Sequence, residues 1–405
     1  MREFVLITVS GQDRPGLSAE LTGMLADADL KLLDVAQAVL HGNLSLAVMA
    51  QAEGGLALEA LADRLRGLGT DSALSVQAQR LDLAGYEHWA QAQDQPRYVL
   101  SLLSHGLSAA QLRQVSDIIE RHGLAIERID RLSRPLAVSS QTPATGHGCI
   151  ELRLQGAPLD TEALRAELLS AAQDLGVDLG LQLDDLNRRH RCLAVFDMDS
   201  TLIQAEVIDE LAKAAGVGDR VAAITERAMR GEIDFRASFT ERMALLKGLD
   251  VSVLDEIGAS LRLTDGAEAL FAGLKRLGYK TAILSGGFTY FARQVQARLG
   301  IDYVYANELQ VEDGKCTGVA VEPIVDAQRK ADLLRELAAR EGLALEQTIA
   351  VGDGANDLPM LALAGLGVAF RAKPLVRASA KQAISSLGLD GVLYLLGVEE
   401  RLLRG

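Results

Sequence analysis

The stretch Leu193-Ala194-Val195-Phe196-Asp197-Met198-Asp199-Ser200-Thr201 decides the fold of the second half of this chain. Its four apolar residues predict a short buried strand, and the acidic and hydroxyl side chains after them predict a loop. Two later segments repeat this arrangement: Thr281–Leu284 precedes Ser285-Gly286-Gly287, and Thr348–Val351 precedes Gly352–Asp357. Because long helical stretches separate these runs, the sequence indicates an α/β fold with a parallel sheet buried on both faces. Ligands bind at the carboxyl ends of the strands in such sheets, so we expect the three loops to converge at one edge.

Two further features belong to this second half. The stretch at about 208–273 has no strand pattern and interrupts the first strand–helix unit, so we predict an inserted helical bundle there. The pair Asp313-Gly314 lies between two β-like flanks and predicts a small hairpin.

The first half of the chain contains an internal repeat. The sequence Gly-Leu-Ser-Ala occurs at 16–19 and at 106–109, each time after a β-like run and at the start of an amphipathic helix. Two strands, a helix and a last strand are predicted after each copy: near 31–41, 44–52, 56–67 and 74–79 in the first, and near 124–132, 148–156, 160–175 and 178–184 in the second. This βαββαβ order is typical of ferredoxin-like α+β domains.

The expected domain boundaries follow from this pattern. They are 1–81, 97–185 and 190–405, with Asp82–Gln95 as a linker and 133–147 as a long loop inside the second repeat.

The composition excludes several classes of protein. The chain has 405 residues, with 41 basic and 55 acidic side chains and a formal charge of −14, which argues against nucleic acid or an anionic membrane as the main partner. No run of about 18 apolar residues predicts a transmembrane helix, and the N-terminus does not resemble a signal peptide. The three cysteines show no CxxC spacing, so we expect a cytoplasmic protein without a zinc site.

The chemistry of the second half must come from carboxylates, lysine and hydroxyls, because all six histidines precede residue 191. Asp197 and Asp199 stand two residues apart at a strand end and can share one hard cation. The third loop adds further oxygens, which is the donor set that Mg²⁺ prefers. The segment Ser285–Gly287 offers a hydroxyl and backbone N–H groups to phosphate oxygens, and Lys330 adds a positive charge.

These groups suggest attack by a carboxylate on phosphorus. With no histidine available, we assign Asp197 as the nucleophile that forms an aspartyl-phosphate. Asp199 protonates the departing alkoxide and then activates water. Each motif alone has an ordinary structural explanation as a turn or loop. The order DxDST, SGG, Lys and GDGxND is what makes coincidence improbable.

Residues 193–400 resemble the haloacid dehalogenase superfamily, and specifically its phosphoserine phosphatase family. The resemblance rests on Asp197–Thr201, Ser285–Gly287, Lys330 and Gly352–Asp357. It implies a Rossmann-like core with an inserted helical cap, and Mg²⁺ bound by the Asp197 side chain, the Asp199 main-chain carbonyl and Asp353. It also implies a set of phosphate-site residues: Ser285, Gly286 and Lys330 as phosphoryl contacts, with Asn356 and Asp357 tuning the site.

Four residues in and before the predicted cap match the same family pattern. By resemblance, Glu206 would pair with a substrate α-ammonium, and Arg242 would hold an α-carboxylate as a bidentate fork. Met229 and Phe235 would line the closed pocket. The alternative is that these residues are exposed helix charges and ordinary cap core.

The implied activity is Mg²⁺-dependent hydrolysis of O-phospho-L-serine to L-serine and phosphate, the last step of L-serine biosynthesis. Phosphoryl transfer to another alcohol such as homoserine, or action on phosphoproteins, stays open. A sensor with an inactive phosphatase half is disfavoured by the complete motif set.

The two N-terminal repeats resemble ACT domains, which bind amino acids as effectors. In the first repeat, Asp13 and Gly16 would contact an amino acid, with serine as the candidate effector. The second repeat has a shorter loop without the aspartate, which leaves Gly106 as its candidate contact. The resemblance also implies a homo-oligomer, expected to be a dimer. The alternative is that both modules serve only in dimerisation or packing.

Overall fold

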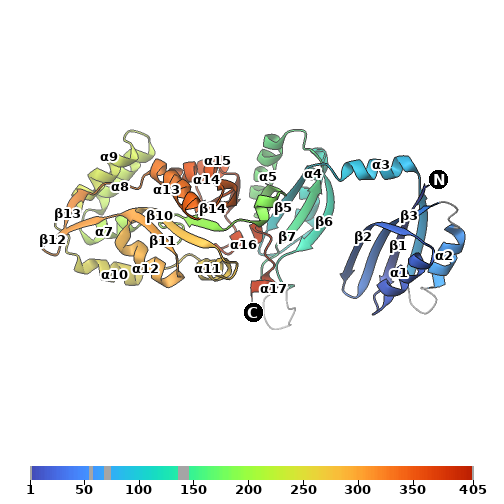
Figure 1. Cartoon of the computed structure of the whole chain (residues 1–405). Coiled ribbons are helices and arrows are strands. Elements are labelled where there is room, and N and C mark those ends of the chain that lie inside the picture. Colours follow the sequence, from blue (N-terminus) through green and yellow to red (C-terminus); the bar gives the residue numbers. More distant parts are fainter. Residues whose placement is uncertain (1, 54–57, 68–73, 136–145, 404–405) are drawn as a thin grey trace. The chain divides into compact units, whose positions relative to one another are not determined.

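The computed structural model describes residues 2–53, 58–67, 74–135 and 146–403. The chain divides between Gln95 and Pro96 into two compact units (Figure 1). No helix in the described ranges has the length and apolar character that a bilayer crossing requires.

The first unit is a four-stranded antiparallel sheet in the order β2-β3-β1-β4, as the βαββαβ pattern predicted. Alternate residues of the first strand, Val5, Ile7 and Val9, are buried against Leu17 and Leu21 of the first helix. The elements are β1 (Arg2–Gln12), α1 (Leu17–Asp27), β2 (Lys31–Leu40), β3 (Asn43–Glu53), α2 (Leu58–Arg66) and β4 (Leu74–Leu81). Residues 56 and 57 of the predicted second helix lie outside the described ranges.

The segment predicted as a linker, Asp82–Gln95, contains a helix, α3 (Leu83–Ala92), which the sequence analysis did not predict. The Asp82 carboxylate accepts a hydrogen bond of 2.7 Å from the Gly85 backbone N–H and so caps the helix. The Tyr86 ring stacks on Phe4 of β1 with a centroid distance of 4.3 Å. An N-cap aspartate and a stacked aromatic ring therefore hold this segment in a helix.

The second unit begins with another antiparallel sheet, in the order β6-β7-β5-β8. Its elements are β5 (Arg97–Leu103), α4 (Ala109–Arg121), β6 (Ala125–Arg131), β7 (Ile150–Gln155), α5 (Thr161–Leu175), β8 (Asp178–Leu183) and the short α6 (Leu186–Arg189). The two repeats start their first helices differently. Helix α1 follows Gly16, which has a left-handed φ of 88°, whereas α4 is capped by a reciprocal Ser108–Gln111 capping box. Most of the predicted loop 133–147 lies outside the described ranges.

The core of the second unit is a six-stranded parallel sheet in the order β11-β10-β9-β14-β15-β16. Within β9, Ala194 and Phe196 belong to one buried cluster, and Leu193 and Val195 to another. The sheet is therefore buried on both faces, which confirms the sequence-based prediction. Its strands are β9 (Leu193–Phe196), β10 (Lys280–Phe288), β11 (Tyr303–Asn307), β14 (Thr348–Gly352), β15 (Leu366–Phe370) and β16 (Gln382–Ile384).

Helices of the core cover this sheet (Figure 1). They are α11 (Ala267–Arg276), α12 (Thr289–Leu299), α13 (Ala327–Arg340), α14 (Leu358–Leu363) and α15 (Pro374–Ser379), with 3₁₀ turns at Leu345–Gln347 and Ala355–Asp357. Two short helices, α16 (Gly391–Leu395) and α17 (Glu400–Leu403), follow the last strand.

A helical insert follows the first loop of the core. It consists of α7 (Val207–Ala214), α8 (Gly218–Met229), α9 (Phe235–Leu245) and α10 (Ser252–Ser260). The predicted hairpin is present as β12 (Leu309–Glu312) and β13 (Lys315–Ala320), with Asp313 and Gly314 at positive φ in its turn. The predicted cap range of about 208–273 includes most of α11. Phe271 of that helix contacts Phe196 of β9 at a ring-centroid distance of 4.8 Å, so α11 packs against the core sheet.

Candidate active site

Strand pairing brings the three predicted loops to one edge of the sheet. The Asp197 backbone N–H donates a 2.9 Å hydrogen bond to the Val351 carbonyl, which places the DxDST loop beside Gly352-Asp353. On the other side of β9, β10 pairs as far as Ile283 with Phe196, just before Ser285. The predicted convergence is thus confirmed.

Lys330 forms ion pairs with the first and third loops. It lies in the first turn of α13, which Asp326 caps by accepting a 2.9 Å hydrogen bond from the Arg329 N–H. Its side chain is fully buried, with Nζ 2.8 Å from Asp197 Oδ2 and 2.7 Å from Asp357 Oδ1. Asp197 Oδ1 accepts a further hydrogen bond of 2.7 Å from the Met198 backbone N–H. Both oxygens of Asp197 are therefore held in fixed positions.

The charges of this cluster depend strongly on one another. Burial disfavours the Lys330 ammonium, but attraction to Asp197 and Asp357 outweighs burial and raises its pKa, so the ammonium stays charged. Burial and repulsion from Asp197 raise the pKa of Asp353 to about 7 and that of Asp357 to about 7. An excess of buried negative charge is what a bound cation would relieve.

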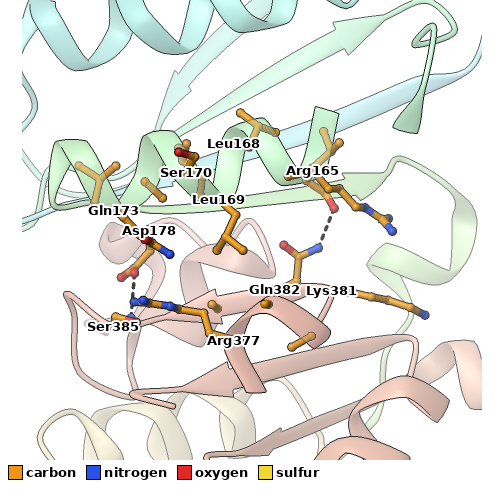
Figure 2. Close-up of a pocket in the computed structure, with 18 of the residues that line it drawn as sticks. Arg165, Leu168, Leu169, Ser170, Gln173, Asp178, Arg377, Lys381, Gln382 and Ser385 are labelled. Carbon is orange, nitrogen blue, oxygen red and sulfur yellow. Dashed lines mark hydrogen bonds between the residues drawn. The ribbon is translucent and has the colours of Figure 1, made fainter. Parts of the chain in front are cut away.

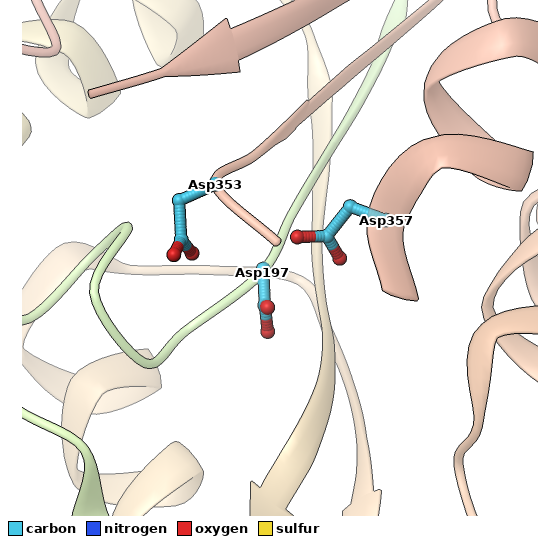
Figure 3. A group of neighbouring side chains, drawn as sticks. All are labelled: Asp197, Asp353 and Asp357. Atoms are coloured by element: carbon cyan, nitrogen blue, oxygen red, sulfur yellow. The ribbon is translucent and has the colours of Figure 1, made fainter. Parts of the chain in front are cut away.

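Three of these carboxylates form a site that suits a divalent cation (Figure 3). One oxygen each from Asp197, Asp353 and Asp357 lies within 4.8 Å of the others. Asp353 Oδ1 also accepts a 3.0 Å hydrogen bond from Thr201 Oγ1, which orients its carboxylate. Hard oxygen donors without nitrogen or sulfur favour Mg²⁺-type cations over zinc.

Asp199 has a different environment from Asp197. One of its oxygens faces the Val207 backbone N–H at 3.4 Å. Burial, together with the charges of Glu206 and Asp197, raises the pKa of Asp199 well above its ordinary value. Burial therefore favours the protonated form of Asp199, as expected for a general acid beside a nucleophile.

The second loop meets the first at Gly287. The Gly287 N–H donates a 2.9 Å hydrogen bond to Ser285 Oγ, and Ser285 is fully buried. A Cβ at position 287 would lie 2.7 Å from Asp199 Oδ2 and 3.1 Å from Ser285 Oγ. Only glycine allows this approach, so Ser285 and Asp199 lie on either side of one backbone position.

The helical insert contacts the same site through the first residue of α9. A Cβ on Gly286 would lie 3.1 Å from the Phe235 ring, at the first residue of α9. The Glu206 carboxylate accepts a 2.7 Å hydrogen bond from Ser200 Oγ. Burial lowers the pKa of Arg242, while the charges of Asp209, Glu206 and Asp199 act in the opposite direction. Its Nε donates a 3.3 Å hydrogen bond to the Ser238 carbonyl.

Two other predicted residues are less informative. Asn356 folds back over the third loop, because its Oδ1 would meet a Cβ on Gly354 at 2.2 Å. Met229 ends α8, and its side chain is outside what the structure describes.

Sequence reasoning missed Asn307, at the end of β11. Its amide donates 2.8 Å to the Gly286 carbonyl and accepts 2.8 Å from the Val325 N–H, and it is 1 % exposed. It therefore ties the second loop to the segment before α13. The only sequence signal was a polar residue at a strand end.

The candidate effector residues lie on loops between a strand and a helix. Asp13 is exposed, and its N–H donates 2.8 Å to the Gly42 carbonyl. In the second module, the loop of Gly106 is packed by Gly148, whose added Cβ would meet the Leu107 N at 2.4 Å. His105 of this loop hydrogen-bonds the Ser386 carbonyl at 2.8 Å. The two loops therefore have different surroundings.

Comparison with known proteins agrees with this architecture. Residues 194–362 match the haloacid dehalogenase-like hydrolase family, and residues 3–79 match the ACT domain family. The parallel sheet, inserted helices and carboxylate cluster thus define a haloacid dehalogenase-type hydrolase preceded by ACT-like modules.

Relatives that are similar over nearly the whole chain show which family of these hydrolases the chain belongs to. A phosphoserine phosphatase of Streptomyces coelicolor is 41% identical over 400 residues, covering 97% of this chain and 92% of that protein. The phosphoserine phosphatase SerB2 of Mycobacterium tuberculosis is 38% identical over 399 residues, covering 97% and 93%. A crystal structure of a probable phosphoserine phosphatase from Vibrio cholerae matches 74% of this chain and 86% of its own, with TM-score 0.59 and 38% identity. The chain belongs to the phosphoserine phosphatase family.

Proposed function

We propose that this enzyme hydrolyses O-phospho-L-serine to L-serine and phosphate through an aspartyl-phosphate on Asp197. The observation that carries the proposal is the position of Asp197, whose two oxygens are held by the Met198 N–H and by buried Lys330. Asp199 of the same loop meets Ser285 at Gly287. The names of the relatives that match along the whole chain support the same substrate.

Each residue has a distinct part in the two steps. The Asp197 carboxylate attacks phosphorus in line, and the bond from phosphorus to the serine oxygen breaks as the Asp199 carboxyl gives its proton to that oxygen. The resulting Asp199 carboxylate then takes a proton from water, which attacks the acyl phosphate and releases phosphate and the Asp197 carboxylate. Ser285, Gly286 and Lys330 hold the phosphoryl oxygens, with Asn356 at the edge of this group.

The donor set of the site fits Mg²⁺. We assign the Asp197 side chain, the Asp199 main-chain carbonyl and Asp353 as its ligands. Asp357 is better placed as the partner of Lys330, since it lies 2.7 Å from that ammonium and its other oxygen accepts 2.9 Å from the Gly354 N–H. When bound, Mg²⁺ would neutralise negative charge on the phosphoryl group.

Removal of the metal should abolish activity. Dialysis against a chelator is expected to stop phosphate release, and added MgCl₂ to restore it. Asp353→Asn should raise the MgCl₂ concentration for half-maximal rate by at least about 10–100-fold. Substitution of residues that only support a metal ligand already lowers metal affinity by this factor. Asp332→Asn, on the surface of α13, is the matched control. An unchanged MgCl₂ dependence in Asp353→Asn would remove this residue from the metal site.

Substrate recognition gives a second prediction. Arg242→Ala should lower kcat/KM for phosphoserine by about 10–100-fold, the loss expected when a charge-assisted hydrogen bond disappears. p-Nitrophenyl phosphate lacks the α-carboxylate, so its kcat/KM should change little. Arg220→Ala, on the exposed side of α8, controls for loss of cap charge. Equal losses on both substrates would exclude a carboxylate clamp and favour a general phosphatase.

The product distribution separates hydrolysis from phosphoryl transfer. Phosphate release should equal phosphoserine consumed, even with excess homoserine present. Phosphohomoserine as a product would show that the site serves a different acceptor, whereas faster turnover of other phosphorylated metabolites would displace phosphoserine as the substrate.

Regulation by serine through Asp13 and Gly16 is the remaining part of the proposal. Calorimetric titration of the full chain with L-serine should show a binding event that Asp13→Ala weakens by about 10-fold or more, as loss of a charged partner predicts. Glu59→Ala, at an exposed position of α2 in the same module, is the control. L-Serine is also the product and can bind at the active site, so a second event points to Gly106 and the second module only if it survives both Asp13→Ala and Arg242→Ala. Unchanged serine binding in Asp13→Ala would leave the first module only a role in assembly. The dimer stays a prediction.

A further inference from the structure

Strand β10 does not end at the second loop of the active site but resumes after it. It pairs with β11 as far as Leu284, opposite Tyr305, and again at Phe288, opposite Asn307. Between these two pairs β10 advances by four positions and β11 by two, so the second loop, Ser285–Gly287, bulges out of the ladder. Residues in a bulge lose their ladder partners, so other contacts must fix their conformation.

The Asn307 side chain supplies such a contact. Its Nδ2 donates a 2.8 Å hydrogen bond to the carbonyl of Gly286, in the middle of the bulge. Its Oδ1 accepts a 2.8 Å hydrogen bond from the backbone N–H of Val325. Because one partner only accepts and the other only donates, the orientation of the amide is fixed. Asn307 is buried, so solvent does not compete for either bond.

Val325 leads directly into the helix that carries Lys330. The next residue, Asp326, caps α13, and its carbonyl accepts a 3.0 Å hydrogen bond from the Lys330 N–H. The Val325 carbonyl faces the second loop, because a Cβ on Gly286 would lie 3.6 Å from its oxygen. Both backbone polar groups of Val325 therefore lie against the second loop or against the side chain that holds it.

We propose that Asn307 is a positioning residue for phosphoryl transfer, whose amide sets the separation between the second loop and Lys330. The inference rests on the proposed function, which assigns Ser285, Gly286 and Lys330 to the phosphoryl oxygens. Asn307 acts through Gly286 and Val325 rather than on the substrate. Donors stabilise a transition state only when they are already in place, and a displacement of about 1 Å lowers the rate by up to about 10²-fold.

Steady-state kinetics of Asn307→Leu tests this role. Leucine has nearly the shape of asparagine but makes neither hydrogen bond, so kcat should fall by about 10–100-fold, with a smaller change in KM. The loss should be equal for phosphoserine and p-nitrophenyl phosphate, because both present the same phosphoryl group. The control is Thr281→Val, which removes a buried hydroxyl that bonds Asp302 at the other end of β10 and should keep the wild-type kcat.

Asn307→Asp separates the hydrogen bond to Gly286 from packing. The introduced carboxylate still accepts from the Val325 N–H, but its second oxygen repels the Gly286 carbonyl instead of donating to it. Protonation turns that oxygen into a donor, and burial raises the pKa of the introduced carboxyl. The kcat of Asn307→Asp relative to wild type should therefore rise as the pH falls, whereas the same ratio for Asn307→Leu should stay constant.

Three kinetic results would overturn the inference: wild-type kcat in Asn307→Leu, a loss confined to phosphoserine, or a loss in Asn307→Asp as large as that in Asn307→Leu at every pH. Failure of the proposed function is distinguishable from these. A wild type that hydrolyses p-nitrophenyl phosphate but not phosphoserine would overturn the substrate alone, since the effect of Asn307 is then measured on p-nitrophenyl phosphate.

Nuclear magnetic resonance of the wild type gives a readout besides activity. Selective ¹⁵N labelling of asparagine yields side-chain amide signals from Asn43, Asn187, Asn307 and Asn356 alone. The Asn307 signal is identified by its absence from the spectrum of Asn307→Asp. At concentrations of inorganic phosphate that inhibit hydrolysis, this signal should shift, while those of Asn43 and Asn187 should not. An unchanged Asn307 signal would contradict a link between its amide and the phosphoryl site.

Discussion

Replacing Asp197 by asparagine should lower kcat by about 10⁴–10⁶-fold, the range seen when a catalytic nucleophile is removed. An amide oxygen of the same shape cannot attack phosphorus effectively, and it leaves no carboxylate to accept the phosphoryl group. The variant should keep its far-ultraviolet circular dichroism spectrum, because Asn preserves the hydrogen bond from the Met198 N–H. Steady-state phosphate release from phosphoserine measures the loss.

A trapping experiment distinguishes the nucleophile from a merely structural residue. Acid quenching during turnover of ³²P-labelled phosphoserine should leave label on the wild-type chain and none on Asp197→Asn. Asp313→Asn, in the hairpin turn where φ is 50°, is the control, since asparagine tolerates that conformation. Wild-type turnover by Asp197→Asn, or persistent labelling, would refute the assigned role.

Replacing Lys330 by methionine should have the largest effect on stability. The substitution leaves Asp197 and Asp357 buried without the cation that lies 2.8 and 2.7 Å away. Removal of one partner from a buried ion pair costs about 3–5 kcal/mol in free energy of unfolding. Denaturant unfolding without Mg²⁺ measures this loss. Phosphate release should fall by at least about 10²-fold, because a positioned charge on the phosphoryl group is lost.

A double variant separates the charge effect from packing. Asp357→Asn in the Lys330→Met background removes one uncompensated carboxylate, so the double variant should be more stable than Lys330→Met alone, with a coupling of about 0.5–3 kcal/mol. Lys315→Met, at the exposed start of β13, should change little. Additive losses in the cycle would mean that Lys330 and Asp357 do not interact energetically.

The sequence was most informative where chemistry and chain order coincide. Apolar runs of four residues, each ending in acidic, hydroxyl or glycine residues, predicted the strands and the edge at which their loops meet. The prediction succeeded because parallel strands must place their carboxyl ends together, whatever the details of packing. The repeated Gly-Leu-Ser-Ala segment located the first helix of each ferredoxin-like module. The strands around it could be predicted because alternation of buried side chains follows directly from strand geometry.

Local pattern was least informative where partners are distant in sequence. Helix α3, inside the predicted linker, was not predicted because its Tyr86 finds its stacking partner, Phe4, at the other end of the module. Asn307 had no distinguishing motif, since its role depends on carbonyl and N–H groups of two separate loops. A cavity between the second module and the core (Figure 2) could not be foreseen either, because its walls come from segments about two hundred positions apart.

The amino-acid sequence alone determined which groups can react, because nucleophile, acid, lysine and metal-type oxygens are properties of residue identity and strand order. Tertiary structure alone decided how strongly these groups act on one another. Burial and distances below 3 Å keep Lys330 charged, and burial raises the pKa of Asp199. Both effects depend on contacts that no local pattern encodes.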